Sequence, residues 1–324
     1  MKNPEGIIAS TSYLFGLTLD GNGSARALDQ QSNLQLPRWV HMDYEGTDCA
    51  TVMKDLELPE AAIDGLVRAD ARPRALLVKK GILLILRGVN LNPGEDPEDM
   101  VSLRLWLEPG QLVSVRHRRI LAAQDIREEL TNGKGPVSIQ DLVFVLIEKL
   151  ATRISEFIET LEERIDAYEL SEDDADPLQL RSEVLKTRRQ AAAVRRFLAP
   201  QREALESFCR QAKDLMDENY ILFIHEQSDR ILRYVEDLDL IRERSMVMQE
   251  ELMNRMAQQQ NIRMYVLSLV AAIFLPISFV TGLFGMNVAG LPGVDNPGAF
   301  LYVSMLMVAV VIGIFLWFRK RKWM

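Results

Sequence analysis

Cysteine and histidine are scarce in this sequence. Its 324 residues include two cysteines, Cys49 and Cys209, and three histidines, His41, His117 and His225, all far apart along the chain. A structural zinc site needs four closely spaced cysteine or histidine ligands, and a disulfide framework needs a larger, even set of cysteines. The sequence therefore predicts neither, and the cysteines are expected to be small buried residues in a reducing compartment.

Catalytic and cofactor motifs are also missing. The first half of the chain contains no glycine-rich phosphate loop and no nucleophile elbow. We therefore expect no enzyme and no bound cofactor, and interpret this half as a scaffold or regulatory domain. Residues 1–10 do not combine a basic stretch with an apolar one, so no signal peptide is expected and the N-terminal body is predicted to stay in the cytosol.

Two long apolar runs lie near the C-terminal end. Met264–Phe284 and Ala299–Phe318 each hold about 20 residues, which is the length of a helix that crosses a hydrocarbon core about 30 Å thick. The loop between them contains no Lys or Arg, whereas basic residues precede the first run and occupy 319–322 after the second. The positive-inside rule then predicts a helical hairpin in a lipid bilayer, with both termini in the cytosol and the loop outside.

The end of the first apolar run carries a specific motif. Gly285-Met286-Asn287, preceded by the Phe-x-Pro-x-x-Phe-x-x-Gly pattern of 274–282, resembles the signature of the CorA superfamily of divalent-cation transporters. Residues 288–293 depart from the aromatic residue and Met-Pro-Glu-Leu that usually follow in magnesium-transporting members. Together with 71–74 and 195–202, they are similar to the zinc-transporter branch of the superfamily, ZntB.

This resemblance implies a homopentamer whose long helices line a funnel leading to a central pore. It also implies transport of divalent metal cations, above all zinc, with magnesium, cobalt, nickel and cadmium as further candidate ions, in a multi-pass protein of the bacterial inner membrane. The expected partners are other copies of the chain, the lipid bilayer and the ions, with no nucleic acid. Two other interpretations stay open: a magnesium or cobalt channel of the same superfamily, and a membrane-anchored sensor or scaffold without transport.

The body before the apolar runs mixes strand and helix patterns and then becomes helical. Alternating apolar segments and turns such as 20–23 and 109–110 predict an α+β cytosolic domain, in which helices cover a mixed sheet. The expected segments are a cytosolic α/β domain at 1–136, antiparallel cytosolic helices at 137–217, a long funnel helix at 218–263, a pore-lining transmembrane helix at 264–284, an outer loop at 285–298, a second transmembrane helix at 299–318 and a basic cytosolic tail at 319–324.

Glycine and proline are both absent from residues 201–275. After a turn near 214–219, residues 220–284 are therefore expected to form one continuous helix. Apolar residues recur along it every seven or fourteen positions, which predicts contact with partner helices: Ile224, Ile231, Leu238 and Leu252.

Opposite charges occupy the two helices before this long one. The helix expected at 139–170 is acidic toward its far end, and Pro177 is expected to end it. The next helix carries seven Arg and Lys residues between 181 and 202. A nucleic-acid surface is one interpretation of these residues, but complementary faces of two helices lying side by side are the simpler account.

One face of the first apolar run predicts the pore lining. Small or weakly polar residues recur there at spacings of three and four, so they share one helix face: Asn261, Met264, Ser268, Ala271, Leu275, Ser278 and Gly282. A helix–helix contact explains such a stripe as well, and the resemblance favours pore lining. Two to three turns earlier, Glu250 and Glu251 are interpreted as funnel acids, with solvated surface acids as the alternative.

No Asp, Glu, His or Cys lies inside either apolar run. Soft zinc ligands are thus absent from the spans, and the ion is expected to pass partly hydrated. We assign Asn287 as the selectivity residue that binds the hydrated metal ion, Gly285 to the tight turn that ends the helix and Met286 to packing. Asp295 in the outer loop is interpreted as an outer acidic ring, repeated in every subunit; the alternative is a surface acid that shapes the turn before Pro297.

Overall fold

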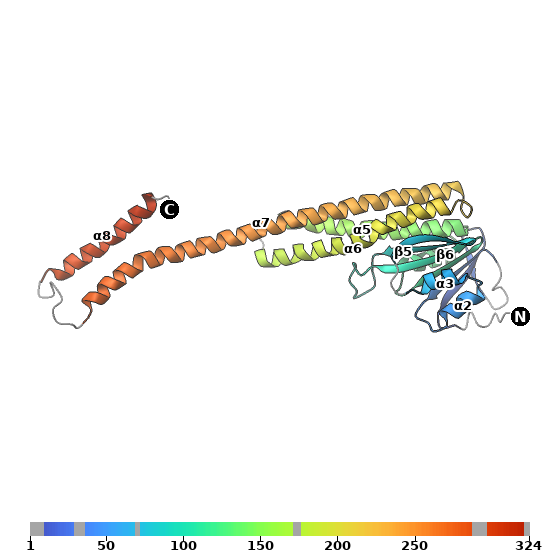
Figure 1. Cartoon of the computed structure of the whole chain (residues 1–324), viewed down its shortest axis with the longest axis horizontal. Helices are drawn as coiled ribbons and strands as arrows, with labels where there is room; N and C mark the ends of the chain where they lie inside the picture. The colour runs from blue at the N-terminus through green and yellow to red at the C-terminus, as the bar shows by residue number, and fades with distance from the viewer. Residues whose placement is uncertain (1–9, 29–35, 69–71, 171–175, 287–296, 321–324) are drawn as a thin grey trace. The chain divides into compact units, whose positions relative to one another are not determined.

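The computed structural model describes residues 10–28, 36–68, 72–170, 176–286 and 297–320. The chain forms two compact units, Met1–Gln249 and Glu250–Met324. The first unit contains a sheet with helices on both faces. The second contains the apolar C-terminal part of one long helix and a second apolar helix (Figure 1). The two units therefore differ in where their apolar side chains lie: the first unit buries them in a core, and the second has them on its surface.

A seven-stranded sheet forms the centre of the first unit within the described residues. Its strand order is β2-β1-β3-β7-β6-β5-β4, and all neighbours are antiparallel except β3 and β7, which are parallel. The mixed sheet expected from the sequence is therefore confirmed. The strands are β1 (Tyr13–Leu19), β2 (Ala25–Ala27), β3 (Arg38–Asp43), β4 (Arg74–Val78), β5 (Gly81–Gly88), β6 (Val101–Glu108) and β7 (Gln111–Arg116).

Both turns predicted from glycine positions join neighbouring strands. Between β1 and β2, Asp20 Oδ1 accepts hydrogen bonds from the backbone N–H groups of Asn22 at 2.8 Å and Ser24 at 3.0 Å. Between β6 and β7, Gly110 has a φ of 77°, a left-handed conformation that favours glycine. These local signals are strong because a tight turn admits few side chains.

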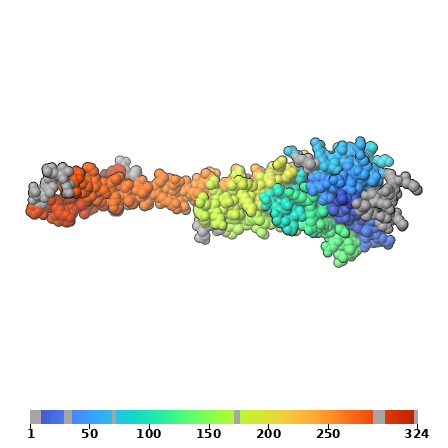
Figure 2. All heavy atoms as spheres, turned by 90° about the horizontal axis from the view of Figure 1, so that it is seen from below, coloured from blue at the N-terminus to red at the C-terminus, as the bar shows by residue number. Residues whose placement is uncertain are grey.

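Helices cover the two faces of the sheet. On one face lie α2 (Cys49–Asp55) and α3 (Glu60–Val67); on the other lie α4 (Leu121–Thr131), α5 (Ile139–Leu170) and α6 (Pro177–Gln211) (Figures 1 and 2). Successive strand residues point to opposite faces. In β5, Leu83 and Ile85 therefore join the core under α2 and α3, while Ile82, Leu84 and Leu86 join the core under α5 and α6.

The long helix predicted from the missing glycine and proline is observed. It is α7 (Glu218–Phe284), with 67 residues, or about 100 Å at 1.5 Å per residue. The apolar residues Ile224, Ile231 and Leu238 are at most 1% exposed and belong to the same buried core as α5 and α6. The seven-residue spacing predicted contact with partner helices, and for this part of α7 the partners are α5 and α6 of the same chain.

Pro177 does not end the acidic helix, so that expectation is wrong. The helix α5 ends at Leu170, and Pro177 is the first residue of α6. Proline fits this position because its missing N–H would lack a helical partner there in any case. The preceding Asp176 caps the helix, since its side chain accepts a hydrogen bond from Leu178 N at 3.4 Å.

Charged residues of α5 and α6 are both linked to α7 by ion pairs. Arg244 Nη2 on α7 lies 2.6 Å from Asp166 Oδ1 and 2.8 Å from Glu169 Oε2 on α5. Arg195 Nε on α6 lies 2.6 Å from Asp239 Oδ1 on α7. The sequence suggested complementary faces of α5 and α6, but these ion pairs connect each of the two helices with α7 instead. Each pair is partly exposed, so its individual contribution is small.

A buried histidine on β3 makes the stability of the fold depend on pH. His41 is 2% exposed, its ring lies 4.9 Å from that of Phe15, and its Nδ1 is 2.7 Å from Ser114 Oγ. Burial, aided by the positive charges of Arg116 and Arg127, lowers the pKa of His41 to about 3. In an unfolded chain its pKa is about 6.5.

We expect this histidine to destabilise the fold as the pH falls from about 6.5 toward 3, because the unfolded chain then binds a proton that the folded chain does not. Its contribution to the free energy of unfolding falls by up to about 1.4 kcal/mol per pH unit in that range. Thermal unfolding of wild type and His41→Gln across this range measures the difference in slope. Parallel pH profiles would contradict the assignment.

Candidate functional site

Two helices end the described chain, and both suit a membrane by length and composition. They are the C-terminal part of α7 and α8 (Ala299–Lys320). Their large apolar side chains lie on the surface: Leu267 is 70% exposed, Phe279 is 71% exposed and Phe300 is 84% exposed. Contiguous apolar surface of this kind is typical of contact with lipid or with another chain. Both apolar runs of the expected hairpin therefore form helices.

The predicted pore lining follows one exposed face of α7. Met264 is 58% exposed and Leu275 is 68% exposed, but exposure does not distinguish this face, because Phe274 and Phe279 outside the stripe are 61% and 71% exposed. Ser268 Oγ donates to Met264 O at 2.8 Å. That bond uses the hydroxyl proton within the helix and leaves the lone pairs of the oxygen for another partner. The face is available for a pore or a neighbouring subunit, and pore lining stays a prediction.

The signature motif begins where α7 ends. Gly285 N donates to Thr281 O at 2.9 Å, directly after the last helical residue, Phe284. This position agrees with a turn at Gly285. Met286 is 46% exposed in the single chain, so the predicted packing of its side chain requires another chain or lipid.

Two of the predicted site residues have no described position. Asn287, assigned as the selectivity residue, and Asp295, assigned as the outer acidic ring, both lie outside the described residues. Their roles therefore stay predictions that rest on the sequence.

The two funnel acids differ in position and in environment. Glu250 is exposed and stands eleven residues before Asn261, so at 100° per residue it lies within about 20° of the predicted lining face. Glu251 points about 100° away from Glu250, and its Oε1 lies 3.3 Å from Arg255 Nη2. Glu250 is therefore the better candidate for a pathway residue.

An acidic series along α7 was missed in the sequence. Asp229, Glu236 and Glu243 are exposed and stand seven residues apart, and the same spacing reaches Glu250. The series lies about 140° around the helix from the buried seam of Ile231 and its neighbours. The sequence shows these acids as a seven-residue repeat. The apolar residues on α7 have the same period, and that period was interpreted only as contact between helices.

The acidic series does not form a metal site within one chain. Successive members are about 10.5 Å apart along the helix, which is too far to share one ion. Within the described ranges, no three His, Cys, Asp or Glu side chains gather closely enough to hold a metal ion. A cation that follows this face would therefore meet the carboxylates one level at a time.

Comparison with known proteins identifies the family. A family profile described as "CorA-like Mg2+ transporter protein" matches residues 35–320. The chain belongs to the CorA family. It is 36% identical over 322 residues to the divalent cation transporter CmaX of Pseudomonas aeruginosa, and 31% identical over 315 residues to the zinc transport protein ZntB of Yersinia enterocolitica; each match covers 96% of both chains. The solved structure of full-length CmaX matches with a TM-score of 0.83 at 35% identity, covering 97% of this chain and 99% of that one.

The resemblance inferred from Gly285-Met286-Asn287 is thus confirmed, together with the fold class of the CorA family. The chain is a divalent-cation transporter of this family, and its relatives carry the names of transporters rather than of enzymes. Because the family consists of membrane transporters, α8 and the C-terminal part of α7 are assigned to the membrane.

Proposed function

We propose that this CorA-family chain assembles as a homopentamer in the bacterial inner membrane and moves zinc through a central pore. The observation that carries the proposal is the exposed acid Glu250 on α7, which lies within about 20° of Asn261, where the small, weakly polar stripe begins. If this face of α7 points to a five-fold axis, Glu250 becomes a ring of carboxylates. Such a ring raises the local concentration of divalent cations.

The ion is proposed to keep much of its water in the membrane. The stripe offers the hydroxyl oxygens of Ser268 and Ser278, whereas acids, histidines and cysteines are missing from both apolar runs of the sequence. Five copies of the Asn287 side-chain amide are proposed to bind the hydrated ion at the mouth, and five copies of Asp295 to form the outer acidic ring. With the basic residues near both membrane helices in the cytosol, the mouth faces outward.

Zinc is favoured by the residues around the signature motif. The sequence after Asn287 lacks the Met-Pro-Glu-Leu of magnesium-transporting members, and a relative matched over 96% of this chain is named a zinc transport protein. Magnesium or cobalt is the second candidate, because the family profile is named for Mg2+ and because a pathway for hydrated ions suits an ion that loses water reluctantly.

The electrical gradient is sufficient to drive uptake. A divalent cation that crosses 100 mV, negative inside, gains about 4.6 kcal/mol, twice the value for one charge. No ionisable relay of Asp, Glu or His lies in the apolar runs, so any coupling to protons is assigned to groups outside the bilayer.

Flux through the purified protein tests the function. The full chain is reconstituted in liposomes that contain zinc- or magnesium-sensitive dye, and uptake is followed with and without an inside-negative potential and a pH gradient. Saturable zinc uptake that rises with the potential is the expected result. Magnesium uptake without zinc uptake would establish the second candidate. No flux of either ion would leave a membrane-anchored sensor or scaffold as the function.

The two neighbouring acids provide a matched test of the proposed face. We expect Glu250→Gln to raise the half-saturating zinc concentration, most clearly at low ionic strength, because a ring of carboxylates attracts cations less once it is neutral and because salt screens this attraction. Glu251→Gln makes the same change about 100° away on the helix and is expected to have a smaller effect. Equal effects of both variants at two salt concentrations would contradict the assignment of this face to the pathway.

A further inference from the structure

The helices α5 and α6 each present a charged face on the surface of the first unit. Three exposed acids recur along α5 at spacings of three and four, so they share one side of the helix and form its acidic face: Glu156, Glu159 and Glu163. Two exposed arginines, Arg189 and Arg196, stand seven residues apart on α6 and form its basic face. The first unit therefore carries two helical surfaces of opposite charge.

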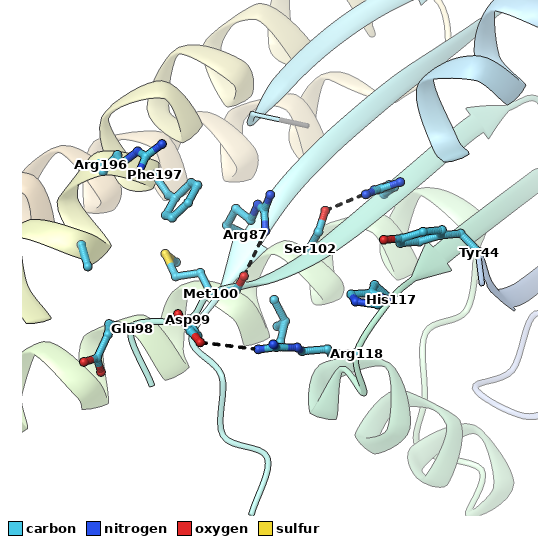
Figure 3. A pocket seen from close by; sticks show the side chains of 13 residues that line it. Tyr44, Arg87, Glu98, Asp99, Met100, Ser102, His117, Arg118, Arg196 and Phe197 are labelled. Atoms are coloured by element: carbon cyan, nitrogen blue, oxygen red, sulfur yellow. Dashed lines mark hydrogen bonds and ion pairs between the residues drawn. The ribbon is translucent and has the colours of Figure 1, made fainter. Parts of the chain in front are cut away.

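Neither face is neutralised within the described part of the chain. The ion pairs that α5 and α6 make there use other side chains and include no member of either face. Glu159 Oε1 accepts a hydrogen bond from Ser155 Oγ at 3.0 Å, and Arg196 Cζ lies 5.7 Å from the centroid of the Phe197 ring (Figure 3). These contacts are made with neutral groups, so both faces keep their charge.

The acidic face and the basic face do not meet within one chain. The contact between α5 and α6 is made by other residues, and Arg164 Nη1 donates to Gln190 Oε1 at 3.1 Å. Glu163 and Arg189 each stand one position before a residue of this contact, so each points about 100° away from it. The two faces are complementary in sign, but they point away from the place where their helices touch.

The two helices lie on different sides of α7. Asp239 of α7 is 2.6 Å from Arg195 of α6, and Arg244 of α7 is 2.6 Å from Asp166 of α5. The exposed acid Glu236 lies about 60° around α7 from Asp239 and about 80° from Arg244. These angles add up to the angle of about 140° between Asp239 and Arg244. Glu236 therefore has α6 on one side and α5 on the other.

A closed ring of copies brings these two sides together. In such a ring every subunit offers one surface to the next copy and a different surface to the previous copy, which is a head-to-tail contact. If the exposed side of α7 at Glu236 points toward the axis, α6 of one subunit lies beside α5 of its neighbour. The basic face then meets an acidic face rather than a second basic one.

The charged residues of the two faces lie at matching heights. Since α5 ends at Leu170, α6 begins at Pro177 and Arg164 contacts Gln190, the two helices run antiparallel. Glu163 and Arg189 are each one residue from that contact, so their heights along the helices differ by only about 3 Å. Rotation about an axis parallel to the helices leaves heights unchanged, so the two residues stay level in neighbouring subunits.

A second pair has the same property. Glu159 lies five residues before Arg164 and Arg196 lies six residues after Gln190. Because the helices are antiparallel, both displacements have the same direction, and the two heights differ by about 1.5 Å. Two oppositely charged pairs are thus aligned at once, although nothing within a single chain requires this alignment.

We propose that the basic face of α6 docks on the acidic face of α5 of a second copy of this chain. Glu163 then lies beside Arg189 of the partner subunit, and Glu159 beside Arg196 of the partner subunit. The proposal rests on the homopentamer of the proposed function and adds which surfaces meet. Each exposed pair contributes little by itself, but complementary charges fix register and select the correct partner.

Cross-linking between subunits tests this contact. The full chain with Glu163→Cys and Arg189→Cys is purified in detergent, its mass is measured by light scattering, and it is treated with a short bifunctional maleimide. A head-to-tail contact links every chain to two others, so a denaturing gel is expected to show a ladder from dimer to pentamer. Wild type and the two single variants keep Cys49 and Cys209 and are expected to give no ladder.

Thr152→Cys with Arg189→Cys is the matched control. Thr152 is exposed and lies within about 20° of Glu163 around α5, but it is eleven residues, or about 16 Å, further along the helix. This pair of thiols is expected to stay unlinked. A ladder as strong as that of the first variant would show that the reagent does not report the proposed register.

Charge exchange supplies a second measurement. Glu163→Arg places like charges side by side and is expected to make the oligomer dissociate at a higher protein concentration than wild type, most clearly at low salt. Adding Arg189→Glu restores opposite charges and is expected to restore assembly. A double variant that dissociates more readily than Glu163→Arg would contradict the pairing.

The outcomes separate this contact from the function itself. A pentamer by light scattering that transports zinc but gives no ladder would overturn the docking of α6 on α5 and leave the proposed function standing. Cross-linking that stops at dimers would replace the head-to-tail contact by a two-fold one. A monomer by light scattering would refute both the contact and the homopentamer.

Discussion

Asn287→Ala is expected to abolish divalent-cation uptake while the oligomer stays intact. Each chain loses one side-chain amide at the proposed mouth of the pore, so a pentamer loses five carbonyl oxygens at once. The apolar runs contain no acid, histidine or cysteine that replaces them. A hydrated divalent ion then has no fixed ligand where it enters the pore. Without such a ligand, the loss of water molecules from the ion costs free energy that nothing offsets. Zinc uptake into liposomes measures the loss.

The same outer segment supplies a control for this variant. Asn296→Ala removes an amide of the same kind nine positions later and is expected to keep uptake near the wild-type rate. Size exclusion in detergent establishes that both variants assemble. Wild-type flux through a correctly assembled Asn287→Ala protein would refute the role of Asn287 as the selectivity residue.

Leu238→Pro is expected to destabilise the chain by about 3 kcal/mol or more, because proline removes a helix hydrogen bond and its ring clashes with the preceding turn. Leu238 is 0% exposed and lies in the core that α7 shares with α5 and α6. The change therefore affects the fold of each subunit as well as its assembly. A lower unfolding temperature together with loss of the oligomer on size exclusion is the expected result.

Leu238→Met separates the effect of the helix break from that of the side chain. It keeps volume and helix propensity, so it is expected to cost less than about 1.5 kcal/mol. Wild-type unfolding and a normal oligomer in Leu238→Pro would show that α7 is interrupted at this position and that the continuous helix is wrong.

The sequence by itself determined the features that depend on neighbours along the chain. The length and composition of the two apolar runs predicted helices that match α8 and the C-terminal part of α7. The absence of Gly and Pro from 201–275 predicted one long helix, because nothing in that stretch favours a break. Gly285-Met286-Asn287 pointed to the CorA family, which the comparisons confirm.

The sequence was ambiguous on α7, where two different sets of residues have the same seven-residue period. A repeat of seven on α7 describes both the seam of Ile224, Ile231 and Leu238 and the acidic series that starts at Asp229. Periodicity shows that residues share a face, but it does not show what covers that face. The structure assigns the apolar seam to α5 and α6 of the same chain and leaves the acids exposed.

Only the tertiary structure decided which distant segments meet. Trp39 on β3 pairs with Leu112 on β7 in the parallel contact, and nothing local in either strand specifies a partner so far along the chain. Strand pairing of this kind is selected by the burial of both faces of the sheet at once, a property of the whole fold. That pairing brings together Tyr44, directly after β3, and His117, directly after β7, whose rings lie 5.0 Å apart. Arginines that are scattered over the sequence, Arg87, Arg104 and Arg196, likewise line one pocket only in the folded chain.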